Sequence, residues 1–131
     1  MPLIQIHLMK GKSPKYIKAV MDGVQKALVK AWKIPLTDRF QMLSEYKKEH
    51  FHFNKTIWGM KRSDHLIAIY ITSIFRSEEM KKKLYQELIK VLGKNPKVRK
   101  DDVFVTIVTV QREDWSFGGG IAQLTDPSQH P

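Results

Sequence analysis

One pattern of residues occurs twice in this chain, and the two copies lie 63 positions apart. The apolar run at residues 3–8 is similar to the run at residues 66–71. After each run come a short turn and a serine suited to cap a helix, Ser13 in the first copy and Ser77 in the second. Because an internal repeat fixes the architecture of a chain, we predict two copies of one structural unit.

The first unit has the periodicity of a strand, a helix and a second strand. Residues 3–9 are rich in Ile and Leu, as a buried strand is. Pro14 suits the first helical position, and the helix ends near Ile34 because the residue before a proline avoids the helical region. A second strand is predicted over residues 39–45. Within the predicted helix, between Pro14 and Pro35, apolar residues recur at helical spacing: Ile17, Val20, Met21, Val24, Leu28, Ala31 and Trp32.

The second unit repeats this plan. We predict a strand over residues 65–73, a helix from Ser77 to Leu92, and a fourth strand, rich in Val and Ile, over residues 103–110. An acidic residue precedes the last strand of each unit, Asp38 in the first and Asp101 in the second. The two units therefore share their order of elements and the residue type at this turn.

Two strand–helix–strand units define the expected fold class. Each unit implies a right-handed crossover and parallel strands. Side by side they give a two-layer α/β arrangement of the α+β class, a four-stranded sheet with two helices on one face. The other face would be bare and apolar, which predicts oligomerisation.

The expected domain organisation follows from the same units. We expect one domain over residues 1–125, with units at roughly 2–45 and 65–110. Residues 46–64 would be a connecting loop that is functional or forms a lid. Residues 115–121 would form a glycine-rich C-terminal turn, and residues 126–131 a frayed tail.

The charge of the chain is strongly positive and unevenly distributed. The net charge is +10, of which residues 1–63 carry +9 and residues 64–131 carry +1. Such a surface attracts nucleic acid, anionic membranes or small carboxylates. The chain has no cysteines, which excludes disulfide scaffolds and fits a reducing compartment. No long apolar run opens the chain, so we expect no signal peptide, no membrane span and a cytoplasmic location.

Four motifs in order resemble the tautomerase superfamily, in particular its malonate semialdehyde decarboxylase-like group. They are Met1-Pro2-Leu3-Ile4-Gln5-Ile6, Pro35-Leu36-Thr37-Asp38-Arg39, Arg76-Ser77-Glu78-Glu79 and Asp114-Trp115-Ser116-Phe117-Gly118. The likeness spans roughly residues 2–121 with the spacing preserved. It implies a protomer of two β-α-β units, assembly into a homotrimer, and catalysis without a cofactor.

The resemblance also implies roles for particular residues. Removal of Met1 would free the amine of Pro2, which would act as a general base when neutral or a general acid when protonated. An α-amine has a pKa of about 7.7–8.0, close to the working pH that acid–base catalysis needs. Asp38 would hold a proton or activate water, and Arg76 would bind the substrate carboxylate with its planar donor group. Lys12 is the repeat equivalent of Arg76, at an offset of 64, and could contribute charge or simply be solvated.

The remaining candidates concern the wall of the site and its specificity. Trp115 and Phe117 match aromatic residues that line the site in the family. Arg39 is a possible substrate contact, although neighbours on a strand point in opposite directions and Asp38 precedes it. Where the decarboxylase has a second arginine, this chain has Ile74. We therefore predict proton transfer on small keto/enol or unsaturated carboxylic acids, with malonate semialdehyde decarboxylase or hydratase activity as the alternative.

Two non-enzymatic interpretations stay open at this point. The basic half could hold nucleic acid, although Tyr70 is the lone aromatic residue of the strand at 65–73, and RNA-binding sheets use several. A family member that has lost activity could serve as an oligomeric scaffold. His50 and His52 alternate as strand ligands do, but no third ligand stands at a suitable spacing, so we expect no metal site.

Overall fold

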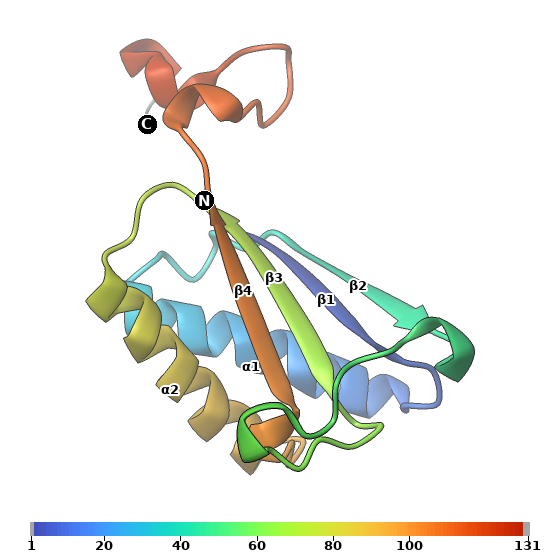
Figure 1. Ribbon diagram of the computed structural model, residues 1–131. Helices are drawn as coiled ribbons and strands as arrows, with labels where there is room; N and C mark the ends of the chain where they lie inside the picture. The colour runs from blue at the N-terminus through green and yellow to red at the C-terminus, as the bar shows by residue number, and fades with distance from the viewer. Residues whose placement is uncertain (1, 130–131) are drawn as a thin grey trace.

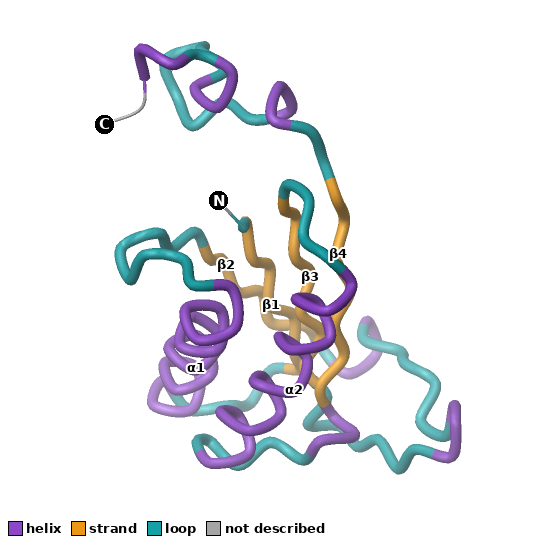
Figure 2. The backbone as a smooth tube through the Cα atoms, turned by 90° about the vertical axis from the view of Figure 1, so that its left-hand side faces the viewer, coloured by secondary structure: helices purple, strands orange, loops and turns teal. Residues whose placement is uncertain are grey.

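The computed structural model describes residues 2–129, which form a four-stranded sheet with both α-helices on one of its faces (Figure 1 and Figure 2). The first unit consists of β1 (Leu3–Met9), α1 (Pro14–Trp32) and β2 (Gln41–Tyr46), and the second of β3 (Ile67–Ser73), α2 (Glu78–Lys94) and β4 (Val103–Thr109). The described residues also contain short 3₁₀ helices, η1 (Lys48–His50), η2 (Ile57–Gly59), η3 (Lys100–Asp102), η4 (Arg112–Asp114), η5 (Gln123–Thr125) and η6 (Pro127–Gln129). The predicted two-layer fold is confirmed.

The strand order is β2-β1-β3-β4, and this order relates the two units to each other. The pairs β1–β2 and β3–β4 are parallel, as predicted, whereas the central pair β1–β3 is antiparallel, with Ile6 opposite Ile69. The units are therefore related by an approximate two-fold rotation. The start of β1 and the start of β2 share one end of the sheet with the ends of β3 and β4 (Figure 1).

Both helices begin where the sequence predicts, at serine caps. Ser13 Oγ accepts a hydrogen bond from the Tyr16 amide, and Ser77 Oγ accepts one from the Met80 amide, each at 3.1 Å. These bonds satisfy amides that have no partner inside the helix. The helix α2 continues to Lys94, two residues beyond its predicted end.

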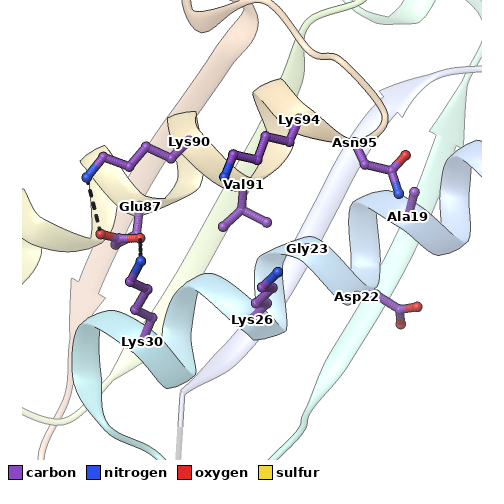
Figure 3. Close-up of a pocket in the computed structure, with 10 residues that line it drawn as sticks. All are labelled: Ala19, Asp22, Gly23, Lys26, Lys30, Glu87, Lys90, Val91, Lys94 and Asn95. Carbon is purple, nitrogen blue, oxygen red and sulfur yellow. Dashed lines mark ion pairs between the residues drawn. The ribbon is translucent and has the colours of Figure 1, made fainter.

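The core lies between the sheet and the helices. Ile4, Ile6 and Leu8 point from β1 into this layer and are fully buried. The helices approach each other closely at Gly23, where an added Cβ would lie 3.0 Å from Leu92 Cδ2. Figure 3 shows the outer groove between them, in which the buried Glu87 carboxylate lies 3.6 Å from the ammonium groups of Lys30 and of Lys90.

The face of the sheet without helices was predicted to be bare and apolar. This prediction is wrong in part, because the face is neither wholly bare nor wholly apolar. His7 points to this face with its side chain partly buried, and its Nδ1 lies 2.6 Å from the Tyr46 hydroxyl. The segment after β2 folds back over one end of the face, where Phe51 packs with Leu66 and Ala68. The part of the face that this segment leaves open mixes polar residues with the exposed Met42 and Val108.

The chain leaves β4 at the end of the sheet at which β1 starts and continues beyond that end (Figure 1). Within the segment expected to be a tail, Pro127–Gln129 form η6, and Ser128 Oγ donates a 2.7 Å hydrogen bond to Asp126. His130 and Pro131 lie outside the described residues. Neither helix within residues 2–129 has the length and hydropathy that crossing a membrane requires.

Candidate active site

The start of β1 lies between the start of β2 and the end of β3. The Ile4 amide donates a 2.9 Å hydrogen bond to the Phe40 carbonyl, just before β2. On the other side Leu3 pairs with Thr72, near the end of β3. One step further along this antiparallel register, Pro2 comes opposite Ser73. Pro2 is buried, so the sheet itself places this residue in a sheltered position.

Arg76 follows β3 and directly precedes Ser77, the cap of α2. Its guanidinium carbon lies 4.8 Å from the centroid of the Trp32 ring, and its Nε lies 3.4 Å from Ser73 Oγ. Burial lowers the pKa of Arg76, and the nearby negative charge of Asp38 opposes this effect. An arginine stays charged in such a setting, and a partly desolvated guanidinium binds a carboxylate more strongly than an exposed one.

Asp38 lies in the turn that leads into β2, and a buried side chain of α1 fixes this turn. Gln25 Nε2 donates hydrogen bonds to the carbonyls of Asp38, at 3.1 Å, and Leu36, at 3.5 Å. The Asp38 amide donates to the Pro35 carbonyl at 3.0 Å. Because Asp38 acts electrostatically on Arg76, the structure brings a carboxylate and a cation together near the start of β1.

Arg39 is directed elsewhere. Its Nη2 lies 2.9 Å from Asp22 Oδ1 on α1, and its Nε donates a 2.9 Å hydrogen bond to Gln41. The pKa of Asp22 is lowered by its hydrogen bonds to Lys18 first and Arg39 second. The structure therefore pairs the guanidinium of Arg39 with α1 and does not bring it to Arg76.

The aromatic residues of the C-terminal turn reach the same end of the sheet. The rings of Trp115 and Phe117 stack with centroids 5.5 Å apart, and Phe117 lies 5.7 Å from Phe40. Gln123 holds the turn, since it accepts from the Phe117 amide at 3.0 Å and donates to the Gly118 carbonyl at 2.8 Å. The contact with Phe40 brings this apolar wall next to the start of β1.

The segment 46–64, predicted as a connecting loop and a possible lid, lies at the other end of the sheet. It begins where β2 ends and leads into the start of β3 (Figure 1). This segment therefore does not cover the candidate site of its own protomer, and its role as a functional loop or a lid stays a prediction. Within residues 2–129 no group of three His, Asp or Glu side chains that could hold a metal ion is found, at His50 and His52 or elsewhere.

Four further residues shape this site without standing out in the sequence as site residues. The apolar pattern places Trp32 only in the core of its helix, and no motif indicates Ser73, Gln25 or Phe40. The sequence does not distinguish a buried glutamine such as Gln25 from an exposed polar residue of the same helix. Its burial becomes apparent only when the helix is packed on the sheet. Trp32 is the one with a usable signal, an aromatic residue at the end of an apolar stripe, which is also what an ordinary core residue looks like.

Comparisons with known proteins agree with this geometry. A family model described as tautomerase enzyme matches residues 38–118. Two Bacillus subtilis (strain 168) proteins are similar over nearly the whole chain. The probable tautomerase YusQ is 34% identical, with 96% of this chain and 100% of the relative covered, and the probable tautomerase YrdN is 33% identical, with 95% and 96% covered.

Solved structures extend the likeness to the fold. A malonate semialdehyde decarboxylase, described with decarboxylase and hydratase activities, superposes with a TM-score of 0.90 at 32% identity, covering 94% of this chain and 95% of the other. A fused 4-OT, described as a symmetric trimer, has a TM-score of 0.74 at 19% identity and 91% and 94% coverage, which supports the fold alone. From its sequence, its fold and these matches, the chain belongs to the tautomerase family and is a tautomerase-like, isomerase-type enzyme.

Proposed function

We propose that this enzyme moves protons on small keto or enol carboxylic acids with the amine of Pro2, which becomes free when Met1 is removed. One observation carries the proposal above all others. The half-buried guanidinium of Arg76 contacts Ser73, and Ser73 comes opposite Pro2 when the β1–β3 register is continued one step beyond the Leu3–Thr72 pair. A carboxylate held by Arg76 thus has its remaining atoms near the nitrogen of Pro2.

The proposed reaction is the ketonisation of an enol acid. Arg76 binds the carboxylate through its N–H groups. The neutral amine of Pro2 removes the proton from the enol oxygen, a carbonyl forms, and the adjacent carbon takes up a proton from the amine. One proton leaves oxygen, one arrives at carbon, and the amine returns to its starting state. No cofactor takes part in this proposal.

Three features suit the amine to this role. A buried amine has a lowered pKa because burial disfavours its charged form, and the cation of Arg76 lowers that pKa further. A general base performs best with a pKa near the working pH. Asp38 supplies a negative charge on the same side, where it can orient a water or hold a proton.

The aromatic wall supports a substrate with an apolar portion. Phe117 and Phe40 contact each other beside the start of β1, and Trp115 stacks on Phe117. The indole Nε1 of Trp115 is buried without a hydrogen-bond partner among residues 2–129. In the proposal this donor is available to a polar atom of the substrate or of a neighbouring subunit, whereas Arg39 would contact substrate only after release from Asp22.

Decarboxylation or hydration of malonate semialdehyde is the second candidate. The likeness to a malonate semialdehyde decarboxylase, at 32% identity over 94% of the chain, favours it. Against decarboxylation stands Ile74, which occupies the position of a family arginine and provides no positive charge. Proton transfer and addition of water need only one cation for the carboxylate, so they agree better with this chain.

We further propose a homotrimer in which sheets from three protomers face one another. The exposed Met42 and Val108 on the open face of the sheet support it, as does the likeness to a fused 4-OT described as a symmetric trimer. The helices, with their lysines, would then face outward. The cytoplasmic location predicted from the sequence is retained as part of this proposal.

Ultraviolet absorbance of phenylenolpyruvate tests the proposed activity. We expect the wild-type enzyme to accelerate ketonisation, Pro2→Ala to lose most of this acceleration, and Arg76→Ala to raise KM. Lys83→Ala removes a positive charge from the exposed side of α2 and should change neither kcat nor KM. If protein with a free Pro2 amine leaves the spontaneous rate of ketonisation unchanged, the proposal is wrong.

A further inference from the structure

The internal repeat places a second cluster of charged residues at the opposite end of the sheet from the candidate active site. Lys12 directly precedes Ser13, the cap of α1, as Arg76 directly precedes Ser77, the cap of α2. His65 lies 63 positions after Pro2, immediately before the apolar run that opens β3. The approximate two-fold rotation therefore maps the position of Pro2 and Arg76 onto that of His65 and Lys12.

These residues surround a hollow in the structure. Its volume is about 240 Å³, and it lies where β1 ends, β3 starts and α2 connects to β4, at the lower end of the sheet in Figure 1. Ligand pockets for larger molecules start near 300 Å³, so this hollow suits a small ligand. It is lined by Lys12, Tyr16, His65, Lys97, Val98, Arg99 and Asp102.

The cation and the imidazole at this position are in direct contact. Lys12 Nζ contacts His65 Nδ1, and it also lies 4.8 Å from the centroid of the Tyr16 ring. An ammonium group can only donate hydrogen bonds, so Nδ1 of His65 is the acceptor in this contact. The cation therefore contacts the face of an aromatic ring in both repeat-related positions. Lys12 contacts Tyr16, and Arg76 contacts Trp32.

The hollow has an excess of positive charge. Lys12, Lys97 and Arg99 face a single carboxylate, Asp102. This carboxylate is fully buried and accepts 2.7 Å hydrogen bonds from the amide and the hydroxyl of Ser63. Arg99 is its nearest cation, at a distance of 3.8 Å. One carboxylate so engaged cannot neutralise three cations, and the excess attracts an anion.

We infer that this repeat-related hollow is a second binding site, and that it takes a small oxyanion, either a carboxylate or a phosphate. The ammonium of Lys12 and the guanidinium of Arg99 provide charged donors, and the hydroxyl of Tyr16 a neutral one. Burial, with a smaller effect of Asp102, raises the pKa of Tyr16, so the phenol keeps its proton and can donate. The inference is independent of the activity proposed for Pro2.

Two-dimensional NMR of the isotope-labelled full chain tests this site with inorganic phosphate and with acetate as separate probes. Ionic strength is held constant with chloride. We expect saturable chemical-shift changes of the backbone amides of Lys12, His65 and Arg99 with at least one probe. The probe that binds more tightly shows whether the site prefers a phosphate or a carboxylate. Lys12→Gln and Arg99→Gln should each weaken binding about tenfold, as expected on loss of one charge-assisted hydrogen bond.

A matched control separates a built site from general surface charge. Lys83→Gln removes the same charge from the exposed side of α2, and binding should change less than about twofold. Lys12→Arg should retain binding, which keeps the test valid if Lys12→Gln folds poorly. The inference is overturned if neither probe shifts these amides saturably, or if Lys83→Gln weakens binding as much as Lys12→Gln and Arg99→Gln.

Discussion

The guanidinium carbon of Arg76, which follows β3, lies 4.8 Å from the centroid of the Trp32 ring at the end of α1. Trp32 is itself fixed, because its Nε1 donates a 2.9 Å hydrogen bond to the Met80 carbonyl in α2. The helix of the first unit therefore orients the cation of the second unit. The carboxylate binding proposed for Arg76 would therefore depend on how the two units pack and not on the loop after β3 alone.

Replacement of Trp32 should weaken substrate binding more than turnover. Trp32→Leu removes the ring under Arg76, and we expect KM for phenylenolpyruvate to rise about fivefold to thirtyfold, since a cation–π contact contributes about 1–2 kcal/mol. Trp32→Phe keeps an aromatic face and should raise KM less. Steady-state kinetics measure both effects, with circular dichroism to check the fold. An unchanged KM in folded Trp32→Leu would show that Arg76 does not need the ring.

Gln25 should matter for stability and for catalysis although it cannot reach a substrate. Gln25→Leu leaves two turn carbonyls, of Leu36 and Asp38, without their donor, at an expected cost of about 1–3 kcal/mol in the free energy of unfolding. The turn that carries Asp38 should loosen, so kcat should fall. Gln86→Leu, on the exposed side of α2, is the matched control. The free energy of unfolding in urea and kcat are measured for both variants. Equal values for Gln25→Leu and Gln86→Leu would contradict this role of Gln25.

The residue at position 74 should decide between reaction types. Ile74→Arg adds the cation that the decarboxylase-like group has and this chain lacks. We expect the variant to release carbon dioxide from malonate semialdehyde faster than the wild type, and a coupled assay for bicarbonate measures this rate. Ile74→Gln, polar but uncharged, should not gain the activity. Equal rates in the wild type and Ile74→Arg would mean that a missing charge is not what limits decarboxylation.

His7 should make the fold sensitive to mild acid. Burial lowers the pKa of His7 below its ordinary value of 6.5. As pH falls through about 6.5, the unfolded chain takes up this proton before the folded chain does, so stability is complete above that pH and declines below it. Wild-type stability against urea should fall between about pH 7.5 and pH 5.5.

Two variants isolate the contribution of His7 to that decline. His7→Gln cannot titrate and should show a smaller decline, whereas His50→Gln, at an exposed position, should behave like the wild type. The midpoint of urea unfolding at the two pH values measures this. The same decline in all three proteins would exclude His7 as its source.

Much of the fold could be predicted because the relevant signals are local. Ser13 and Ser77 mark the helix starts, and the repeated apolar runs mark β1 and β3, so the sequence places strands and helices within a few residues. The open face could not be predicted in this way. Whether Phe51 and Phe53 cover the sheet depends on how the chain folds back after β2, which no periodicity within that segment encodes.

The candidate site was predictable only in part, for a similar reason. Pro2, Asp38 and Arg76 came from motifs that resemble a family, and the structure brings their strand ends together. The partners of these residues, Trp32 and Gln25, are side chains of a helix whose rotation on the sheet fixes their contacts. Arg39, by contrast, is a candidate substrate contact by its residue type and motif, but its guanidinium pairs with Asp22 in the structure.

In the proposed reaction a free Pro2 amine carries the proton. The most direct test compares ketonisation of phenylenolpyruvate by preparations whose intact mass shows Met1 removed or retained. We predict that activity rises in proportion to the fraction of chains with free Pro2, and that fully Met1-retaining protein gives only the spontaneous rate. Equal activity in the two preparations would exclude Pro2 as the proton carrier, because in Met1-retaining protein its nitrogen is an amide without a basic lone pair.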